Sequence, residues 1–556
     1  MLGERPDVTI SEPCFINVSF RINIQTMPSR LHRRLCEPLF LLCLAAGLLA
    51  VVVQSGELGT ADTMHRLQTT HWLWTSDPQV FPADYPEFGL HGRGGRLYSW
   101  YGIGQSLLML PADVLGTGLA HLSLFSNYTD DPAVRSIVVS YLTAIFVNLL
   151  TAWIAFRLLR QLSFDVAEAA AGVLALLFCT THLHYTQNMM ENNYIMLLTL
   201  VGFSFQFEWL RTSSRRALFI GSCALGLNLL TRLTTALDLM AAGIFLLLIL
   251  WFEGMRGQKL LGKITEYQKI AAPVYLFFLL LDRVYQFYRF GSFTNTYVSL
   301  FALEYRQRDP SLPPNFPWTT LFHSGFLGPL FQPEKSIFLF DPLLILAIAM
   351  LILFWKRLYP EVRAYGLASL LLLLSYICFY ARYAYWAGDF AWGDRYVSTA
   401  VQFAVLLAVP LLVRYNGVLR QTAFGKAFWL TGCALIFVSL VIQLASLAFW
   451  LPLEIYQMET MGHPTFVIAL RFKNVLAFAL GKMDAWGLNN DSMREDAWDY
   501  VHITTWNFLP FLLRRVGAAP AWVVNLTLGL WLASVGALGA ALLRLRNSLR
   551  ADASSN

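Results

Sequence analysis

Residues 37–66 read EPLFLLCLAAGLLAVVVQSGELGTADTMHR, a long apolar run that ends at two acids, Glu57 and Asp62. The apolar stretch, 37–54, approaches the roughly 20 residues that a helix needs to cross the hydrocarbon core of a membrane. Acids directly behind such a run could serve catalysis, or they could complement the dipole of a following helix. The stretch therefore predicts a membrane protein with carboxylates at the membrane surface.

The composition of the whole chain agrees with a membrane location. Of the 556 residues, 56% are hydrophobic and only 14% are charged, and the mean hydropathy is +0.51. A typical soluble protein has about 25% charged residues. The formal charge of +6 requires no nucleic-acid partner, because basic loops that orient a membrane protein account for it. The seven cysteines show no CxxC spacing, so neither a zinc site nor a disulfide framework is predicted.

The apolar runs predict an all-α polytopic bundle of about 12 transmembrane helices. The predicted spans are 37–54, 135–156, 167–181, 194–210, 217–235, 236–252, 271–288, 338–355, 364–380, 398–413, 427–450 and 519–543. A further run, 103–122, contains Pro111 and Asp113. If this run does not cross, more than half of the 41 lysines and arginines fall in the short loops of one side, which is the positive-inside pattern. We therefore expect 103–122 to lie along the outer membrane surface.

The charge bias places both termini in the cytoplasm and the long polar loops on the outer side. We expect that side to be the periplasm and the protein to lie in the inner membrane of a bacterium. Three segments are predicted. Residues 1–36 form a cytoplasmic N-terminal segment, and residues 37–415 form a catalytic module with periplasmic loops 55–134, 289–337 and 381–397. Residues 416–556 form C-terminal spans with a periplasmic loop 451–518. Long outer loops usually carry function. Met27, which precedes PSRLHRRL, is expected as an alternative start to Met1.

A second polar cluster is THLHYTQNMMENNY, residues 181–194, which we expect to be a tight outer connection between two spans. It carries more hydrogen-bonding side chains than a turn needs. His184, Glu191 and Asn192 are its candidates for binding a sugar or an acceptor, and Glu191 is a candidate second acid. The HxH spacing alone is weak evidence for a metal site.

Four basic residues near the outer ends of spans are candidates for binding a phosphate. They are Arg232, Arg289, Lys335 and Arg395. An arginine offers phosphate a forked contact, and a lysine offers a point charge. Arg232 lies between two spans that join almost without a loop, where a charge is costly and usually functional. Snorkelling of the side chain to the interface is the alternative explanation.

The stretch RYAYWAGDFAWGDRY, residues 382–396, interleaves aromatic rings with charges. Rings stack on the C–H faces of sugars and carboxylates accept hydrogen bonds from hydroxyls, so the stretch favours sugar binding. An interfacial aromatic belt is the alternative. The sugar or acceptor candidates from this and the preceding outer loop are Tyr297, Tyr385, Trp386, Asp389, Trp392 and Asp394.

The order of these motifs resembles the GT-C membrane glycosyltransferases, in the branch that holds protein O-mannosyltransferases, the lipid A aminoarabinose transferase and the rhizobial lipid A galacturonosyltransferases. The similar stretches lie within 37–415 and are ELGTAD, GRLYSWYGIGQSLLMLPADVLG, YRFGSFTNTY, GPLFQPEKSIFLFDP and AWGDRY. The resemblance implies a helical bundle with juxtamembrane helices in the first outer loop. It also implies a polyprenyl-phosphate sugar donor, a lipid, glycan or protein acceptor, and inversion at the anomeric carbon, with Asp62 as the general base.

The sequence departs from the family's Asp-Glu pair, because Thr63 follows Asp62 and the acid Glu57 precedes it instead. The role of Glu57 is therefore open. A divalent metal, Mg²⁺ or Mn²⁺, assists some relatives and not others, so its involvement is open too. The alternative functions are a flippase or transporter, and a polymerase or ligase of lipid-linked glycans. A transporter would place ionisable residues near the bilayer midplane, whereas here they gather at the outer ends of the spans.

Overall fold

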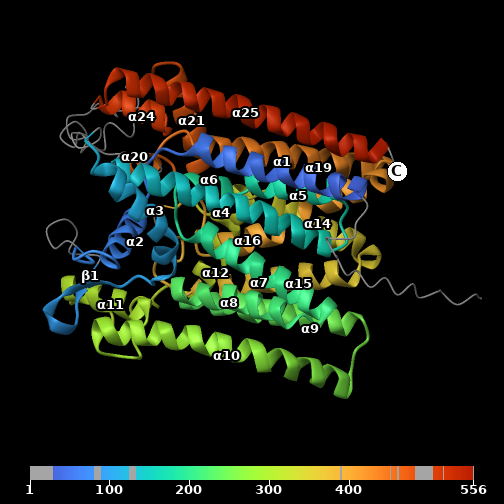
Figure 1. Ribbon diagram of the computed structural model, residues 1–556, viewed down its shortest axis with the longest axis horizontal. Helices are drawn as coiled ribbons and strands as arrows, with labels where there is room; N and C mark the ends of the chain where they lie inside the picture. The colour runs from blue at the N-terminus through green and yellow to red at the C-terminus, as the bar shows by residue number, and fades with distance from the viewer. Residues whose placement is uncertain are drawn as a thin grey trace, which may run out of the picture.

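The structure, a computed structural model, is a bundle of long helices with shorter elements gathered at one end (Figure 1). It describes residues 29–80, 89–123, 133–388, 391–450, 452–459, 462–482, 505–517 and 519–554.

Every predicted span coincides with a helix or with two consecutive helices. They are α1 (Ser29–Val53), α4 (Val134–Gln161), α5 (Val166–Cys179), α7 (Asn192–Thr212), α8 (Arg215–Thr231), α9 (Ala236–Phe252), α10 (Gly257–Phe290), α13 (Ile337–Phe340) with α14 (Leu343–Phe354), α15 (Pro360–Tyr380), α16 (Ser398–Val405) with α17 (Ala408–Arg414), α19 (Ala423–Ser446) and α25 (Ala521–Ser554). By length and composition, 6 helical segments among the described residues could cross a membrane: Val134–Gln161, Leu233–Phe252, Gly257–Phe290, Pro360–Tyr380, Ala423–Ser446 and Ala521–Ala551. The larger number of about 12 crossings stays a prediction.

Three helices extend by eight residues or more beyond their predicted boundaries. α1 begins at Ser29 rather than near 37, and α25 ends at Ser554 rather than near 543. α10 begins at Gly257, so most of the chain between the predicted spans 236–252 and 271–288 is helical. The residues QKLLGKITEYQK in this region are mostly good helix formers. At 1.5 Å per residue the 34 residues of α10 make a helix about 50 Å long, against about 30 Å for the membrane core. The ends of α10 would therefore project beyond a membrane.

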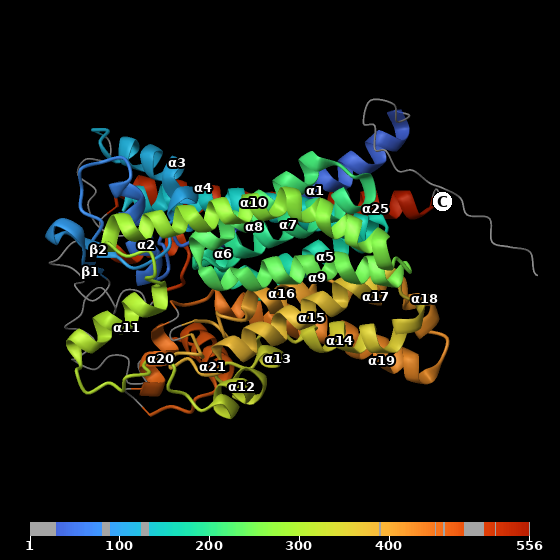
Figure 2. The ribbon, with the colours of Figure 1, turned by 90° about the horizontal axis from the view of Figure 1, so that it is seen from below.

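The shorter elements lie together at one end of the bundle, and the short connections α7–α8, α9–α10 and α17–α19 lie at the other (Figures 1 and 2). The gathered elements are α2 (Ala61–Trp72), β1 (Gly89–His91), β2 (Leu97–Ser99), α3 (Gly104–Ala120), α11 (Tyr297–Arg308), α12 (Phe322–Phe331), α20 (Pro452–Glu459), α21 (Val467–Ala479) and α24 (Leu509–Val516). The end with these elements, called the site end below, carries the segments predicted to be periplasmic.

The described residues are mostly helical, as the all-α prediction expected, and they also include a small antiparallel hairpin. Gly89 pairs with Ser99 and Leu90 with Tyr98. The turn GRGG, 92–95, reverses the chain with two glycines at φ +71, a left-handed conformation that glycine adopts without a steric cost. The hairpin directs the chain that follows it into the bundle, where Tyr98, Trp100 and Tyr101 are buried.

Helix α3 packs along α4 and against α2, so it is part of the folded body. Its buried side includes Met109, Ala112 and Asp113, whereas Val114 and Leu115 are about half exposed. An apolar exposed side on a helix at this end fits the predicted surface position. The structure contains no membrane, so the orientation stays a prediction.

The stretch 181–194, predicted as a tight connection between two spans, joins α5 to α7. It forms α6 (His182–Gln187) and the start of α7, and every residue of it is buried. Segments distant in sequence cover it. Nε2 of Gln187 donates to the backbone carbonyls of Val53 and Asn507 at 2.8 and 2.7 Å. The polar side chains thus hold the site end together from inside.

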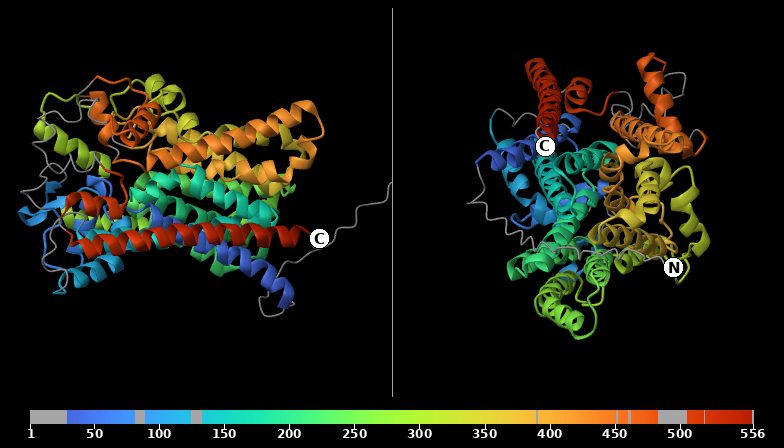
Figure 3. Two further views of the ribbon diagram at one scale, coloured as in Figure 1. Left: turned by 90° about the horizontal axis from the view of Figure 1, so that it is seen from above. Right: turned by 90° about the vertical axis from the view of Figure 1, so that its right-hand side faces the viewer.

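The C-terminal helices also belong to this packed body. α25 runs along the outside of the bundle against α1 (Figure 3), and α24 packs against α25. α21 packs on α19 and α20.

Candidate active site

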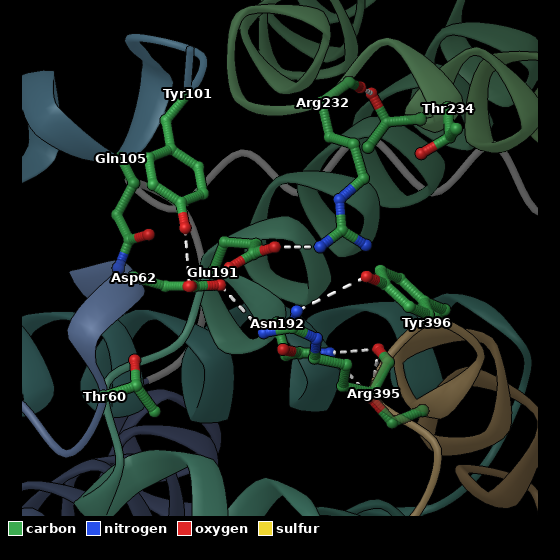
Figure 4. A network of polar contacts seen from close by, with 12 residues as sticks. Thr60, Asp62, Tyr101, Gln105, Glu191, Asn192, Arg232, Thr234, Arg395 and Tyr396 are labelled. Atoms are coloured by element: carbon green, nitrogen blue, oxygen red, sulfur yellow. Dashed lines mark hydrogen bonds and ion pairs between the residues drawn. The ribbon is translucent and has the colours of Figure 1, made fainter. Parts of the chain in front are cut away.

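Asp62 lies in the first turn of α2, at the centre of a network of charged side chains (Figure 4). The helix begins here because the Thr60 hydroxyl caps it by accepting from the backbone N–H of Thr63 at 3.3 Å. Tyr101 donates its OH to Oδ1 of Asp62 at 2.5 Å, and Nη1 of Arg395 donates to Oδ2 at 2.8 Å. Both carboxylate oxygens therefore have a partner.

Glu191 is the second acid of the network. It directly precedes α7 and is buried. Nη1 of Arg66 lies 2.9 Å from its Oε2, and Nη2 of Arg232 contacts its Oε1. Arg66 lies one helical turn after Asp62, with its guanidinium 4.3 Å from the centre of the Tyr101 ring. The network therefore joins α2, the α6–α7 turn and the end of α8.

Neutral side chains contact Arg395 and Arg232. Nδ2 of Asn192 donates to the backbone carbonyl of Arg395 at 2.6 Å and to the hydroxyl of Ser398 at 2.7 Å. Arg232 follows the last residue of α8, and its guanidinium lies 5.1 Å from the centre of the Tyr396 ring (Figure 4).

The network removes charges of both signs from water. Three arginines (Arg66, Arg232 and Arg395) pair with two carboxylates (Asp62 and Glu191). Charges removed from water are costly unless they are paired. These ion pairs therefore offset part of the cost of burying the side chains.

The surroundings hold Asp62 in its ionised form. Burial alone would raise the pKa of Asp62, but the charges of Arg395 and Arg66 and the hydrogen bonds from Tyr101 and Arg395 outweigh it. The pKa of Asp62 therefore lies below its ordinary value. The pKa of Tyr101 is raised by burial and by the neighbouring Asp62 charge, so the phenol keeps its proton. Asp62 can accept a proton, but it is a weak base while Arg395 is bound to it.

A cavity of about 680 Å³ lies beside the network. Arg232, Tyr297 and Tyr396 line it, so the charged residues form part of one wall. The rest is largely apolar, with aromatic lining residues Phe316, Trp318, Phe379, Tyr380 and Tyr383. Such a cavity suits a molecule with an anionic head and an apolar or ring-shaped body.

The aromatic candidates differ in their relation to this cavity. Tyr297 lines it, with its ring centre 5.8 Å from that of Tyr101. Tyr385 packs with its ring centre 5.7 Å from that of Phe301, in the adjoining aromatic cluster. Trp386 packs against Gly328 of α12.

A second group of candidates lies behind Arg395, in residues 391–396, called the site loop below. Nζ of Lys335 donates to the backbone carbonyls of Ala391 and Gly393 at 2.8 and 3.3 Å. Oδ1 of Asp394 accepts from the backbone N–H of Tyr396 at 3.0 Å, and burial raises the pKa of Asp394. These contacts shape the site loop.

Trp392 and His184 lie in the same buried region. The ring of Trp392 stacks on that of His184 at 5.7 Å. Burial lowers the pKa of His184 to about 3, so the imidazole is neutral.

Arg289 is completely buried at the end of α10. Its Nη1 donates to the backbone carbonyls of Ser99 and Tyr101, the latter at 3.2 Å. It therefore anchors the segment that carries Tyr101. Glu57 is half-buried in the link between α1 and α2. Asp389 lies outside the described residues.

Sequence reasoning did not single out Arg66 and Tyr101 as site residues. Arg66 stands four positions after Asp62, a spacing that places both on one side of a helix. Tyr101 belongs to the motif GRLYSWYG, but its approach to Asp62 depends on the hairpin and on Arg289.

The described residues do not form a metal site, because no group of three or more His, Cys, Asp or Glu side chains is placed to hold an ion. The oxygens of Glu191 face arginines instead, and those of Asp62 face the Tyr101 hydroxyl and Arg395. The participation of Mg²⁺ or Mn²⁺ stays an open prediction, and no step below relies on it.

No family model matches the chain, and no curated protein matches it. Among solved structures, the chain is similar to the archaeal oligosaccharyltransferase AglB from Archaeoglobus fulgidus in complex with an inhibitory peptide and a dolichol-phosphate. The identity is 14% and the TM-score is 0.40, over 74% of this chain and 56% of that chain. A likeness of this size does not establish a shared fold, so the glycosyltransferase family stays a proposal.

Proposed function

We propose that the protein is a membrane glycosyltransferase of the GT-C type. It would transfer a sugar from a polyprenyl-phosphate donor to a lipid, glycan or protein acceptor, at the periplasmic face of a bacterial inner membrane. The observation that carries the proposal is the ionised Asp62 in a network with three arginines, beside a cavity of about 680 Å³ with aromatic walls. The resemblance of the sequence motifs supports the same function.

In this proposal the donor phosphate binds at Arg232, which lines the cavity, and at Arg395, whose neighbour Tyr396 lines it. Fixed positive charge at the place where negative charge develops lowers the barrier of a reaction. The apolar tail of the donor would follow the aromatic walls, and the sugar would lie among the rings of Tyr297 and Tyr396. Arg289 and Lys335 already donate to backbone carbonyls, so we assign them to holding the site rather than to contact with phosphate.

Asp62 would act as the general base. Its carboxylate takes the proton of the acceptor hydroxyl, whose oxygen attacks the anomeric carbon while the bond from that carbon to the phosphate oxygen breaks. The electron pair of this bond leaves with the lipid phosphate. A phosphate that engages Arg395 would draw it from Asp62, and the basicity of the carboxylate would then rise. Attack from the face opposite to the leaving group inverts the anomeric carbon.

The test is sugar transfer by the purified protein in detergent, with a panel of labelled polyprenyl-phosphate sugars and a membrane extract as acceptor. Asp62→Asn should keep the unfolding midpoint and reduce the transfer rate by about 10²–10⁴-fold, the usual worth of a general base. Asp309→Asn is the matched control, because Asp309 is an exposed acid of the loop after α11. Wild-type turnover in D62N would contradict the role of Asp62. Transfer in detergent, where no gradient exists, would exclude a pure flippase.

A further inference from the structure

The side chain of Trp392, in the site loop, is enclosed by three other side chains. Its ring stacks on the His184 ring and lies edge-on to the ring of Phe340, with centres 5.0 Å apart. The guanidinium of Arg471, from α21, lies 5.3 Å from the centre of the Trp392 ring. Trp392 has no exposed surface. An aromatic ring enclosed by a cation and two rings has little freedom to move.

Arg471 is itself held in one position. Its Nε and Nη2 donate to the two carboxylate oxygens of Glu454, from α20, at 2.6 and 2.5 Å, and both side chains are completely buried. Its Nη1 donates to the backbone carbonyls of Ser446 and Phe449 at 2.8 and 2.9 Å, at the end of α19. Nδ2 of Asn474 adds a bond of 2.9 Å to Glu454.

Stability alone does not account for this arrangement. A buried ion pair is often no more stabilising than apolar side chains of the same volume, because removing two charges from water is costly. What the pair provides is a fixed direction, because a forked contact between arginine and carboxylate determines the plane of the guanidinium. The oriented guanidinium lies against the ring of Trp392, which stands three residues before Arg395 in the chain.

We propose that Arg471, oriented by Glu454, is a positioning residue that fixes the site loop through Trp392 and thereby places Arg395 against Asp62. The inference rests on the proposed function, because it gives Arg395 a role in transfer. It assigns a role in the site to α20 and α21, whose sequence predicted no function. A displacement of reacting groups by about 1 Å can reduce a rate on the order of 100-fold, so a loosened site loop should be visible in turnover.

The first experiment follows the site loop without using activity. Hydrogen–deuterium exchange and mass spectrometry of peptides covering 391–397 should show faster exchange in Arg471→Lys than in the wild type. Arg414→Lys is the matched control. Arg414 also pairs with a buried carboxylate, Glu168, at 2.6 Å and lies 4.2 Å from the ring of Phe164, but at the opposite end of the bundle. Its substitution should leave the exchange of 391–397 unchanged. Trp392→Phe provides the same comparison if R471K does not fold.

The second experiment measures coupling in sugar transfer. R471K should lower kcat by about 10- to 100-fold, and the double variant R395K/R471K should lose no more than R395K alone, because residues that act through one another are not additive. Unchanged exchange of 391–397 in folded R471K and W392F would overturn the positioning role, and so would additive losses of kcat. A third outcome separates the two proposals. If exchange is faster in R471K but no form transfers sugar, including the wild type, the proposed function is overturned. The positioning of the site loop by Arg471 then still holds.

Discussion

The two ends of the helical bundle differ in how deeply their paired charged side chains are buried. At the site end, the side chains of Arg66, Glu191 and Arg395 are each less than 10% exposed. At the opposite end, Arg211 pairs with Glu253 while their side chains are 42% and 32% exposed. Burying an ion costs several kcal/mol even after relaxation, whereas an exposed pair costs and contributes little. Glu168 at the opposite end is buried too, but its partner Arg414 is 17% exposed, so the most deeply buried ion pairs lie at the site end.

The connections differ in the same way. The opposite end closes with short turns, such as Ser213–Ser214 between α7 and α8. At the site end, segments far apart in sequence converge, and the bond between Asp62 and Arg395 joins positions 333 residues apart. A network of this kind can be altered by a change in any of several segments. Four predictions test the comparison between the two ends.

The largest effect is expected from Glu191→Gln. The substitution leaves Arg66 and Arg232 facing a neutral amide, and breaking a buried ion pair costs about 3–5 kcal/mol. The unfolding midpoint in detergent, followed by intrinsic fluorescence, should fall clearly. An unchanged midpoint would mean that the site end tolerates unpaired charge as well as the opposite end does.

Arg395→Gln should change how stability depends on pH. The pKa of Asp62 is lowered in the folded state, so the stability contributed by its ion pair is present above the unfolded value near 3.8 and is lost as the pH falls through the lower folded value. The difference in unfolding midpoint between wild type and R395Q should therefore be largest above pH 4 and should shrink below it. A difference that stays constant between pH 3 and pH 7 would contradict the coupling of Arg395 to Asp62.

Two glycines with similar backbones should respond unequally. Gly393 of the site loop has φ +72 and Gly254 at the opposite end has φ +78. Alanine in a left-handed conformation costs about 1–2 kcal/mol at either place. At Gly393 the new Cβ would also lie 3.1 Å from the ring of Phe340, whereas at Gly254 it meets no atom within 4 Å. Gly393→Ala should lower the unfolding midpoint more than Gly254→Ala, and only G393A should slow sugar transfer. Equal midpoints would show that the site loop is not tightly packed.

The smallest effect is expected from Glu253→Gln at the opposite end. Its exposed pair with Arg211 should contribute less than about 1 kcal/mol. The unfolding midpoint and the transfer rate should both stay close to the wild type. A loss as large as that of E191Q would show that exposure does not distinguish the two ends.

The positions of the helices followed from the sequence because hydrophobic runs of sufficient length must form helices wherever they meet lipid or each other. The sequence did not predict features that depend on tertiary contacts. The hairpin at Gly89–Ser99 depends on packing of Tyr98 and Trp100, and the burial of 181–194 depends on cover from Gln54 and Asn507, which come from distant segments.

Sequence reasoning predicted only some of the candidate site. Asp62, Glu191, Asn192, Arg232 and Arg395 were selected from separate motifs, and the structure brings them into one network. Their roles in catalysis stay predictions. Lys335, Arg289, Trp392 and His184 were selected by the same reasoning, but the structure places them in contacts that hold the site. A sequence cannot distinguish the two groups, because the residue type does not show whether an arginine contacts a phosphate or a backbone carbonyl.

By itself the sequence determined the helical character of the chain and the end at which its polar residues gather. Both properties follow from the order of apolar and charged residues along the chain, without any tertiary contact. The tertiary structure decided which acid meets which arginine, that Asp62 has two partners, and that the C-terminal helices support the site loop. These contacts join segments that only the folded chain brings together, and ion pairs and hydrogen bonds form only within a few ångströms.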